Sequence, residues 1–263
     1  MSSNATKGAV LVTGASSGIG AALAREFAKQ GFTLVLTARR ENLLEELCEE
    51  LSAQTEVSYI VSDLASSEGT SALIDELKTR EISIDVLVNN AGIAYSENFE
   101  QLDDARIQQL IALNISALST LTLHFVKEMK HRGAGRILNV ASVAAFQPVP
   151  SMSIYAASKA VVLSLTESLS EELRDTGVSV TALCPGLTNT DMVHDLSASN
   201  VPPFMMSRVE DVAREGYEAL MAREVIRIPG VANQAAVTWA KHQPRWLVRG
   251  IGGLVSRFGP GRQ

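Results

Sequence analysis

The chain is 263 residues long, and 46% of its residues are hydrophobic while 20% are charged. This balance is typical of a globular protein with a sizeable core and excludes a disordered or fibrous chain. A formal net charge of −6 argues against nucleic-acid binding, which normally needs a basic face.

The ends and the cysteines of the chain bear on its location. Residues 1–7 contain no apolar stretch, and no later segment has the roughly 18 uninterrupted apolar residues of a membrane span. Cys48 and Cys184 lie far apart, without histidine or cysteine neighbours at metal-ligand spacing. We therefore expect a soluble, cytoplasmic protein with neither a disulfide framework nor a metal site.

Short β-branched runs alternate with segments of helical period along the chain. The runs predict strands at residues 9–12, 33–36, 57–61, 86–88, 136–140, 178–183 and 225–228. Apolar spacing predicts helix faces at Ile19, Leu23 and Phe27, at Leu43, Leu47 and Leu51, and at Leu110, Asn114 and Leu118. This alternation favours an α/β fold: a Rossmann-like, doubly wound, mostly parallel sheet of seven strands with helices on both faces. No linker or repeat divides residues 1–263, so we expect a single domain.

A glycine-rich turn joins the first strand to the first helix. Gly14 can adopt backbone angles closed to other residues, Gly18 lets the backbone approach a pyrophosphate, and Gly20 allows close helix packing. The helix that follows offers free N–H groups and a partial positive charge. A plain strand-to-helix turn is the alternative, but the order strand, turn, helix favours a dinucleotide site. Its residues are Gly14, Ser16, Ser17, Gly18, Ile19 and Gly20.

Two arginines follow the second strand. An acidic residue about twenty positions after the glycines would hold the ribose hydroxyls of NAD, and none is present. Arg39 and Arg40 stand there instead, and guanidinium groups suit the oxygens of a 2′-phosphate. NADP(H) is therefore favoured over NAD(H), with Arg39 the better candidate. In the alternative, the arginines are surface charges paired with Glu41 or Glu45.

Two polar residues occupy unusual places in the middle of the chain. Asn114 interrupts an apolar helix, where an amide is unfavourable unless it has partners. It could serve a polar relay, or it could be a satisfied buried asparagine. Ser142 follows the fifth strand at the carboxyl edge of the sheet, where it could hydrogen-bond a substrate oxygen or simply form a turn.

Tyr155 and Lys159 are four residues apart, so on a helix they share one face. A phenol with an ordinary pKa near 10 is a poor base at neutral pH, but a nearby ammonium favours the phenolate and lowers that pKa. The pair predicts a proton donor/acceptor supported by a lysine. A tyrosine and a lysine at this spacing are common by chance, so the catalytic interpretation of the pair depends on the presence of Ser142 and Asn114.

These motifs together resemble the short-chain dehydrogenase/reductase family from about Lys7 to Thr188. Asn114, Ser142, Tyr155 and Lys159 match the order and spacing of the family's catalytic tetrad. The resemblance implies that further positions contact a nicotinamide cofactor, although Asp63 could also be a turn residue. These positions are Asp63, Leu64, Asn90, Ala91, Gly92, Tyr155, Lys159, Pro185, Gly186 and Thr188.

The resemblance implies an NADP(H)-dependent oxidoreductase that reduces the carbonyl of an apolar ketone or aldehyde, a small molecule, with Tyr155 as general acid. The alternatives are an alcohol or sterol dehydrogenase working in the oxidative direction, and a dinucleotide-sensing module without turnover. Epimerase or dehydratase chemistry ranks lower, because the larger C-terminal region of such relatives is missing. Helices around residues 110–129 and 161–173 could pair subunits into a homodimer or homotetramer.

Two segments after the sixth strand bear on substrate and partners. Residues 186–210 form a predicted substrate loop, whose Met192, Val201, Phe204, Met205 and Met206 either line an apolar pocket or pack as core. Residues 229–263 are apolar and basic, including Trp239, Lys241, Trp246, Leu247, Arg249, Ile251, Leu254, Arg257 and Phe258. This segment could cover the pocket, contact another subunit or lie on a membrane surface. The pocket rim or an interface is favoured, because the basic residues are few for a stable anchor.

Overall fold

The structure is a computed structural model and describes residues 8–190 and 206–258. Seven strands form one sheet in the order β3-β2-β1-β4-β5-β6-β7, and every neighbouring pair is parallel. The strands are β1 (Ala9–Thr13), β2 (Thr33–Ala38), β3 (Val57–Val61), β4 (Ile84–Asn89), β5 (Gly135–Val140), β6 (Val178–Leu183) and β7 (Ile226–Arg227). The predicted Rossmann-like sheet is confirmed, although β7 is shorter than the predicted run at 225–228.

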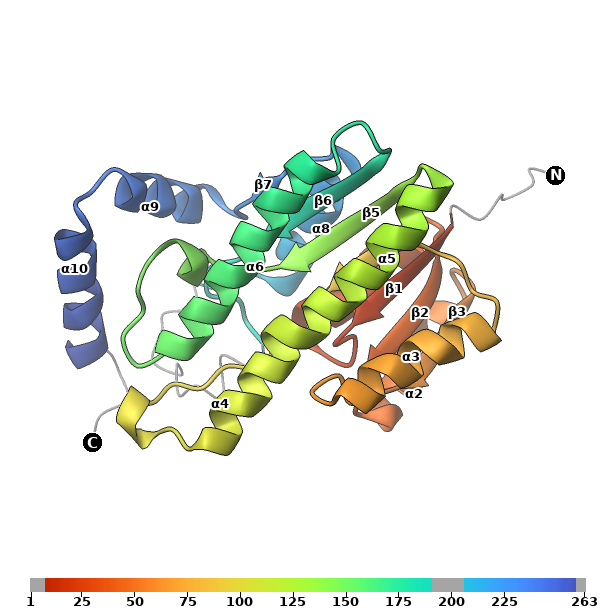
Figure 1. The fold of residues 1–263 in the computed structure, drawn as a ribbon, viewed down its shortest axis with the longest axis horizontal. Helices are drawn as coiled ribbons and strands as arrows, with labels where there is room; N and C mark the ends of the chain where they lie inside the picture. Colours follow the sequence, from red (N-terminus) through yellow and green to blue (C-terminus); the bar gives the residue numbers. More distant parts are fainter. Residues whose placement is uncertain (1–7, 191–205, 259–263) are drawn as a thin grey trace.

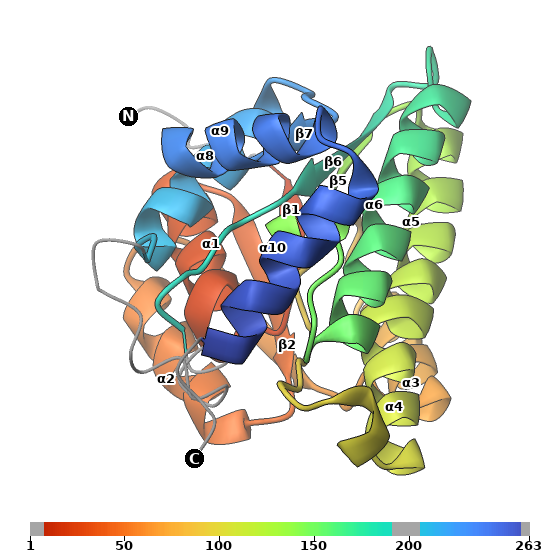
Figure 2. The same ribbon diagram turned by 90° about the vertical axis from the view of Figure 1, so that its left-hand side faces the viewer.

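Helices cover both faces of the sheet (Figures 1 and 2). One face carries α1 (Gly18–Lys29), α2 (Glu41–Ser52) and α8 (Val209–Met221). The other carries α3 (Ser67–Thr79), α4 (Asp104–Ile111), α5 (Leu118–Arg132) and α6 (Ser153–Glu172). Short 3₁₀ turns lie at η1 (Phe99–Gln101) and η3 (Val143–Phe146).

Strand β1 shows why the predicted strands are almost continuously apolar. Val10 and Val12 pack in one core cluster with Phe27 of α1, while Leu11 packs in the opposite cluster with Phe125 of α5. A central parallel strand is buried on both faces, so it cannot alternate apolar and polar residues. On α2 the buried face consists of Leu44, Leu47 and Leu51. Leu43, which spacing placed on that face, therefore lies one position away from it.

Helix α4 continues through η2 (Ala112–Ala117) into α5, and η2 is a π-helical segment. The sequence predicts a regular helix here, since Leu110, Asn114 and Leu118 keep helical spacing. By length and composition the continuous helix Asp104–Arg132 could cross a membrane. Its side chains Phe125 and Met129 are buried in the core against the sheet, as in the central helix of a globular fold.

Two helices follow β7, α9 (Val231–Lys241) and α10 (Arg245–Phe258), with Pro244 between them. They lie at one end of the molecule, outside the helices that cover the sheet (Figures 1 and 2). The order of the sheet also fixes where a ligand can bind. The chain runs outward from β1 through β2 to β3, then returns to β4 on the other side of β1. This reversal opens a crevice at the carboxyl ends of β1 and β4.

Candidate functional site

A cleft of about 280 Å³ lies along the carboxyl ends of the central strands. It brings together residues that the sequence placed in separate motifs: all of the predicted cofactor positions except Gly20, and three of the four predicted catalytic residues. Asn114 lies outside its lining. The cleft is also lined by residues that the motifs did not identify, namely Ala38, Ser62, Ile93, Leu113, Val140, Ala141 and Thr190.

The glycine turn packs so closely against its neighbours that a side chain at Gly14 or Gly20 would collide with backbone atoms. Gly14 has φ +65°, and a Cβ atom there would lie 2.9 Å from the Cα atom of Ala91. Gly20 faces the turn itself, because a Cβ atom there would lie 2.3 Å from the carbonyl oxygen of Gly14. Ser17 precedes α1 without a side-chain cap, so the first N–H groups of the helix stay available to an anion. The turn therefore fits the pyrophosphate of a dinucleotide.

Asn90 fastens this turn from the neighbouring strand. Its amide nitrogen donates to the carbonyl oxygens of Thr13 at 2.9 Å and Gly14 at 3.2 Å. The Thr13 hydroxyl accepts hydrogen bonds from the backbone N–H groups of Asn90 and Ala91, and donates to the carbonyl of Val88. Thr13 thus links β1 to β4 at the point where the crevice opens, a role that the sequence did not predict.

Arg39 and Arg40 both line the cleft, but their surroundings differ. The Arg40 guanidinium donates to the hydroxyls of Ser16 at 3.0 Å and Ser17 at 2.6 Å, so it braces the glycine turn. Arg39 is exposed and has no acidic partner within residues 8–190 and 206–258. Glu45, one predicted alternative partner, instead accepts a hydrogen bond from Tyr59.

Asp63 and Leu64 lie in the cleft lining after β3. The Asp63 carboxylate also accepts a hydrogen bond from the backbone N–H of Ala65 at 3.0 Å. This local hydrogen bond is typical of an aspartate in a turn, which is the alternative role that the sequence allows for Asp63. Asp63 therefore combines a place in the cleft with a structural turn.

Tyr155 and Lys159 project from α6 toward Ser142, which follows β5. The Lys159 ammonium is buried, lies 5.7 Å from the centre of the Tyr155 ring and donates to the Val140 carbonyl oxygen at 2.8 Å. Burial lowers the pKa of Lys159 to about 8. This places the lysine within reach of its neutral form near physiological pH.

Burial raises the pKa of Tyr155 above its ordinary value, and a hydrogen bond with Ser142 opposes that shift. The direction is opposite to the lowering expected from the tyrosine–lysine pair, because desolvation of the phenolate outweighs the other effects. Tyr155 is consequently a protonated phenol at neutral pH. In this state it can donate a proton to an oxygen held beside Ser142.

Asn114 lies behind this group, in the π-helical segment η2. Its Oδ1 atom accepts the N–H of Ile93 at 2.9 Å, while its Nδ2 atom donates to the Ile93 carbonyl at 2.9 Å and to the Ser158 hydroxyl at 3.2 Å. A Cβ atom on Gly92 would lie 3.3 Å from Asn114 Oδ1 and 3.5 Å from Lys159 Nζ. Asn114 is thus a satisfied buried amide that adjoins the lysine. π-Helical turns often occur at functional sites.

The loop after β6 closes another side of the cleft. Pro185, Gly186 and Thr188 line it, and the buried Thr188 hydroxyl donates to the Gly186 carbonyl at 3.0 Å. A Cβ atom on Gly186 would lie 2.4 Å from Oδ1 of Asn233, so α9 packs directly against this loop. Met192, Val201, Phe204 and Met205, predicted for the substrate loop, lie outside the described residues.

Comparisons with known proteins agree with this geometry. Residues 8–200 match the short chain dehydrogenase family model. Sulfoacetaldehyde reductase 2 of Chromohalobacter salexigens is 41% identical over 184 residues, which cover 69% of this chain and 73% of that protein. A short-chain dehydrogenase from Sphingobium yanoikuyae, solved in complex with NADPH, has a TM-score of 0.81 at 34% identity, covering 97% of this chain and 98% of that one. A Burkholderia phymatum structure in complex with NAD has a TM-score of 0.78 at 27% identity, covering 89% and 92%.

Proposed function

The chain belongs to the short-chain dehydrogenase/reductase family of oxidoreductases, and on this premise we propose that it reduces the carbonyl of an apolar ketone or aldehyde with NADPH. The observation that carries the proposal is the pairing of Ser142 with a protonated Tyr155 in the same cleft as the glycine turn. Arg39 follows β2 and Ser142 follows β5, and two strands, β1 and β4, lie between them in the sheet. Because neighbouring strands are about 4.8 Å apart, the two residues are separated by roughly 14 Å across the sheet. An extended dinucleotide can bridge such a distance.

The preference for NADPH rests on the end of β2. Arg39 is an exposed cation in the cleft without an acidic partner among the described residues, and the carboxylate of Asp63, which also lines the cleft, accepts a hydrogen bond from the Ala65 backbone. A guanidinium gives a 2′-phosphate charge-assisted hydrogen bonds. The similar Sphingobium yanoikuyae protein was solved with NADPH, which supports the same preference.

The protein's own groups would act on the carbonyl oxygen. Ser142 holds this oxygen, and Tyr155 donates a proton to it as the carbonyl becomes an alcohol. Lys159, anchored to the carbonyl of Val140, lies over the Tyr155 ring and would hold the ribose hydroxyls of a bound cofactor. Asn114 keeps the loop at Ile93 in place behind Lys159 and serves the relay that returns a proton from solvent. The bound nicotinamide supplies the hydride.

The experiment that tests this function is a panel of ketones and aldehydes assayed with NADPH and NADH in parallel. Turnover with NADPH and little with NADH is the expected result. Tight NADPH binding without turnover of any carbonyl would instead identify the non-catalytic module. A clear preference for oxidising alcohols would reverse the proposed direction.

We also propose that the enzyme is a homo-oligomer that pairs through α5 and α6. Leu123 of α5 is 58% exposed and Val161 of α6 is 42% exposed, so each helix offers an apolar side chain to solvent. Burial of such side chains favours association. Light scattering on the full chain measures the number of subunits.

A further inference from the structure

The outer faces of α9 and α10 form a surface that the proposed function does not use; we call it the C-terminal surface. Ten large apolar side chains are exposed among the described residues, and four of them lie here: Val231, Trp239, Trp246 and Ile251. The chain has only two tryptophans, and both are in this group, 49% and 67% exposed. Exposed apolar side chains that gather in one region of a surface are typical of an interaction site.

Helix α9 has two apolar faces rather than one. Val237 is buried toward the protein, as expected for the inner stripe of a surface helix. The opposite face should then be polar, but Val231, Ala235 and Trp239 follow one another there at four-residue spacing, and all three are exposed. The outer side of α9 therefore carries an apolar stripe beside the exposed polar residues Gln234 and Thr238.

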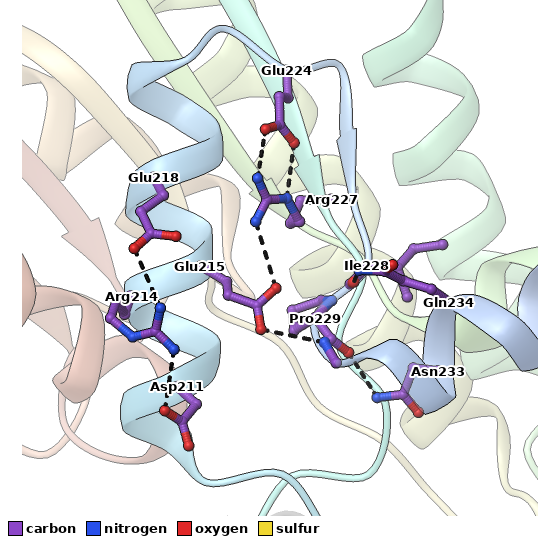
Figure 3. A network of polar contacts seen from close by, with 11 residues as sticks. Asp211, Arg214, Glu215, Glu218, Glu224, Arg227, Ile228, Pro229, Asn233 and Gln234 are labelled. Carbon is purple, nitrogen blue, oxygen red and sulfur yellow. Dashed lines mark hydrogen bonds and ion pairs between the residues drawn. The ribbon is translucent and has the colours of Figure 1, made fainter.

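A polar network holds α9 in this orientation (Figure 3). Arg227 of β7 pairs with Glu224 and with Glu215 of α8, and Glu215 accepts the backbone N–H of Gly230 at 3.3 Å. Asn233 then donates to the Pro229 carbonyl at 2.8 Å. The start of α9 is thus tied to the body of the fold, so its apolar outer face is a fixed feature of the structure.

The charge of this region is opposite to that of the rest of the chain. Residues 225–263 contain six lysines and arginines but no aspartate or glutamate, although the whole chain has a net charge of −6. Arg245 and Arg249 are exposed on α10 and have no acidic partner among the described residues. Lys241 lies 4.5 Å from the centre of the Phe146 ring. The positive charge of the C-terminal surface is therefore complementary to an anionic partner.

We propose that the C-terminal surface binds an anionic phospholipid bilayer, with α9 and α10 lying in the plane of the membrane interface. Exposed tryptophan and aliphatic side chains enter the boundary between headgroups and acyl chains, while Arg245 and Arg249 meet the lipid phosphates. A symmetric contact with a second copy fits less well, because it would gather the same unpaired cations from both copies into one interface. The sequence alone favours the pocket rim or an interface over membrane contact; the exposure of both tryptophans and the unpaired arginines are the observations that support the membrane instead.

The tryptophans make the proposal directly measurable, since the full chain has no others. The full-length protein is mixed with vesicles of phosphatidylcholine and phosphatidylserine in equal parts, and with vesicles of phosphatidylcholine alone. We expect the protein to sediment with the anionic vesicles, with tryptophan emission moving to shorter wavelength, and both effects to weaken in high salt. Neutral vesicles should produce neither effect.

Charge variants separate this surface from general electrostatics. The double variant Arg245→Gln/Arg249→Gln should bind anionic vesicles about thirtyfold more weakly, at roughly 1 kcal/mol for each charge. The matched control Lys29→Gln/Lys78→Gln removes the same charge from exposed positions on α1 and α3 and should bind like the wild type. Carbonyl reduction in vesicle-free buffer should be unchanged in both variants.

Three results would overturn the proposal: no sedimentation with anionic vesicles at low salt, equal weakening by the two double variants, or an emission shift that follows protein concentration but not lipid. The last would assign the surface to a second copy of the chain. Because these readouts are independent of turnover, they stand even if the proposed reaction is wrong.

Discussion

Asn114 holds the backbone of Ile93 with both ends of its amide, accepting the N–H and donating to the carbonyl, each at 2.9 Å. This arrangement ties the π-helical segment to the loop that follows β4. A third bond reaches Ser158 on α6, one residue from Lys159. Three segments that are distant in the sequence thus meet at one buried side chain.

The first prediction concerns this amide. Asn114→Ala leaves the part-buried N–H and carbonyl of Ile93 without these partners, so we expect the free energy of unfolding to fall by about 2 kcal/mol. Ser158→Ala keeps both bonds to Ile93 but removes the third bond and the bond from the Ser158 hydroxyl to the Tyr155 carbonyl, and it should cost about 1 kcal/mol by the same measure. Urea denaturation compares the two variants, and equal losses would show that the paired bonds to Ile93 carry no special weight.

The second prediction concerns the proton donor. Tyr155→Phe removes the hydroxyl but keeps the ring, so NADPH should still bind while kcat falls by at least about a thousandfold. Fluorescence titration measures NADPH affinity, and steady-state assays measure turnover. Near-normal turnover in this variant would assign the proton to another group.

The third prediction separates the two arginines. Arg39→Ala should raise KM for NADPH about ten- to hundredfold and leave KM for NADH nearly unchanged, because only the 2′-phosphate is lost as a partner. Arg40→Ala also frees Ser16 and Ser17, so it should weaken the binding of both cofactors. If Arg39→Ala left the ratio of the two kcat/KM values unchanged, the proposed phosphate contact would be wrong.

Much of the cleft was predictable because parallel strands end at one edge of a sheet. Once Gly14, Arg39, Asn90 and Ser142 each follow a predicted strand, the topology brings them together without further information. Tyr155 and Lys159 were predictable in the same way, since four-residue spacing fixes their common face.

Other features of the site depend on three-dimensional contacts, which the spacing of residues in the sequence does not reveal. The π-helical turn at Asn114 fits the apolar pattern of a regular helix equally well, because the pattern reports side-chain faces and not hydrogen-bond register. The packing of Asn233 against Gly186 joins residues far apart in the sequence. The raised pKa of Tyr155 follows from its burial, which a motif cannot express.

The fourth prediction concerns pH. Unfolded lysine keeps its proton up to about pH 10.4, whereas buried Lys159 loses it near pH 8. Between these values the unfolded chain binds more protons, so the contribution of Lys159 to stability rises with pH, by about 1 kcal/mol from pH 8 to pH 9. Burial also raises the pKa of Cys184 to about 12, which acts in the opposite sense once an unfolded thiol ionises at about pH 8.5; a comparison of two proteins that both keep Cys184 removes this contribution.

Urea denaturation of the wild type and Lys159→Met across this range measures the effect. The difference between their unfolding free energies should change with pH in favour of the wild type. Lys78→Met, at an exposed position on α3, controls for the loss of a lysine. A difference that stays constant from pH 7 to about pH 9 would contradict the lowered pKa.

The fifth prediction compares two glycines with the same backbone conformation. Gly14 has φ +65° and Gly133 has φ +69°, so alanine costs about 1 kcal/mol of backbone energy at either position. A Cβ atom at Gly133 meets nothing within 4 Å, whereas at Gly14 it would lie 2.9 Å from the Ala91 backbone. Gly14→Ala should therefore lower the free energy of unfolding by about 2 to 4 kcal/mol and weaken NADPH binding at least about tenfold. Gly133→Ala should keep its affinity for NADPH. If Gly133→Ala lost as much unfolding free energy as Gly14→Ala, backbone strain would explain the need for glycine at position 14, and the close approach of the Ala91 backbone would not.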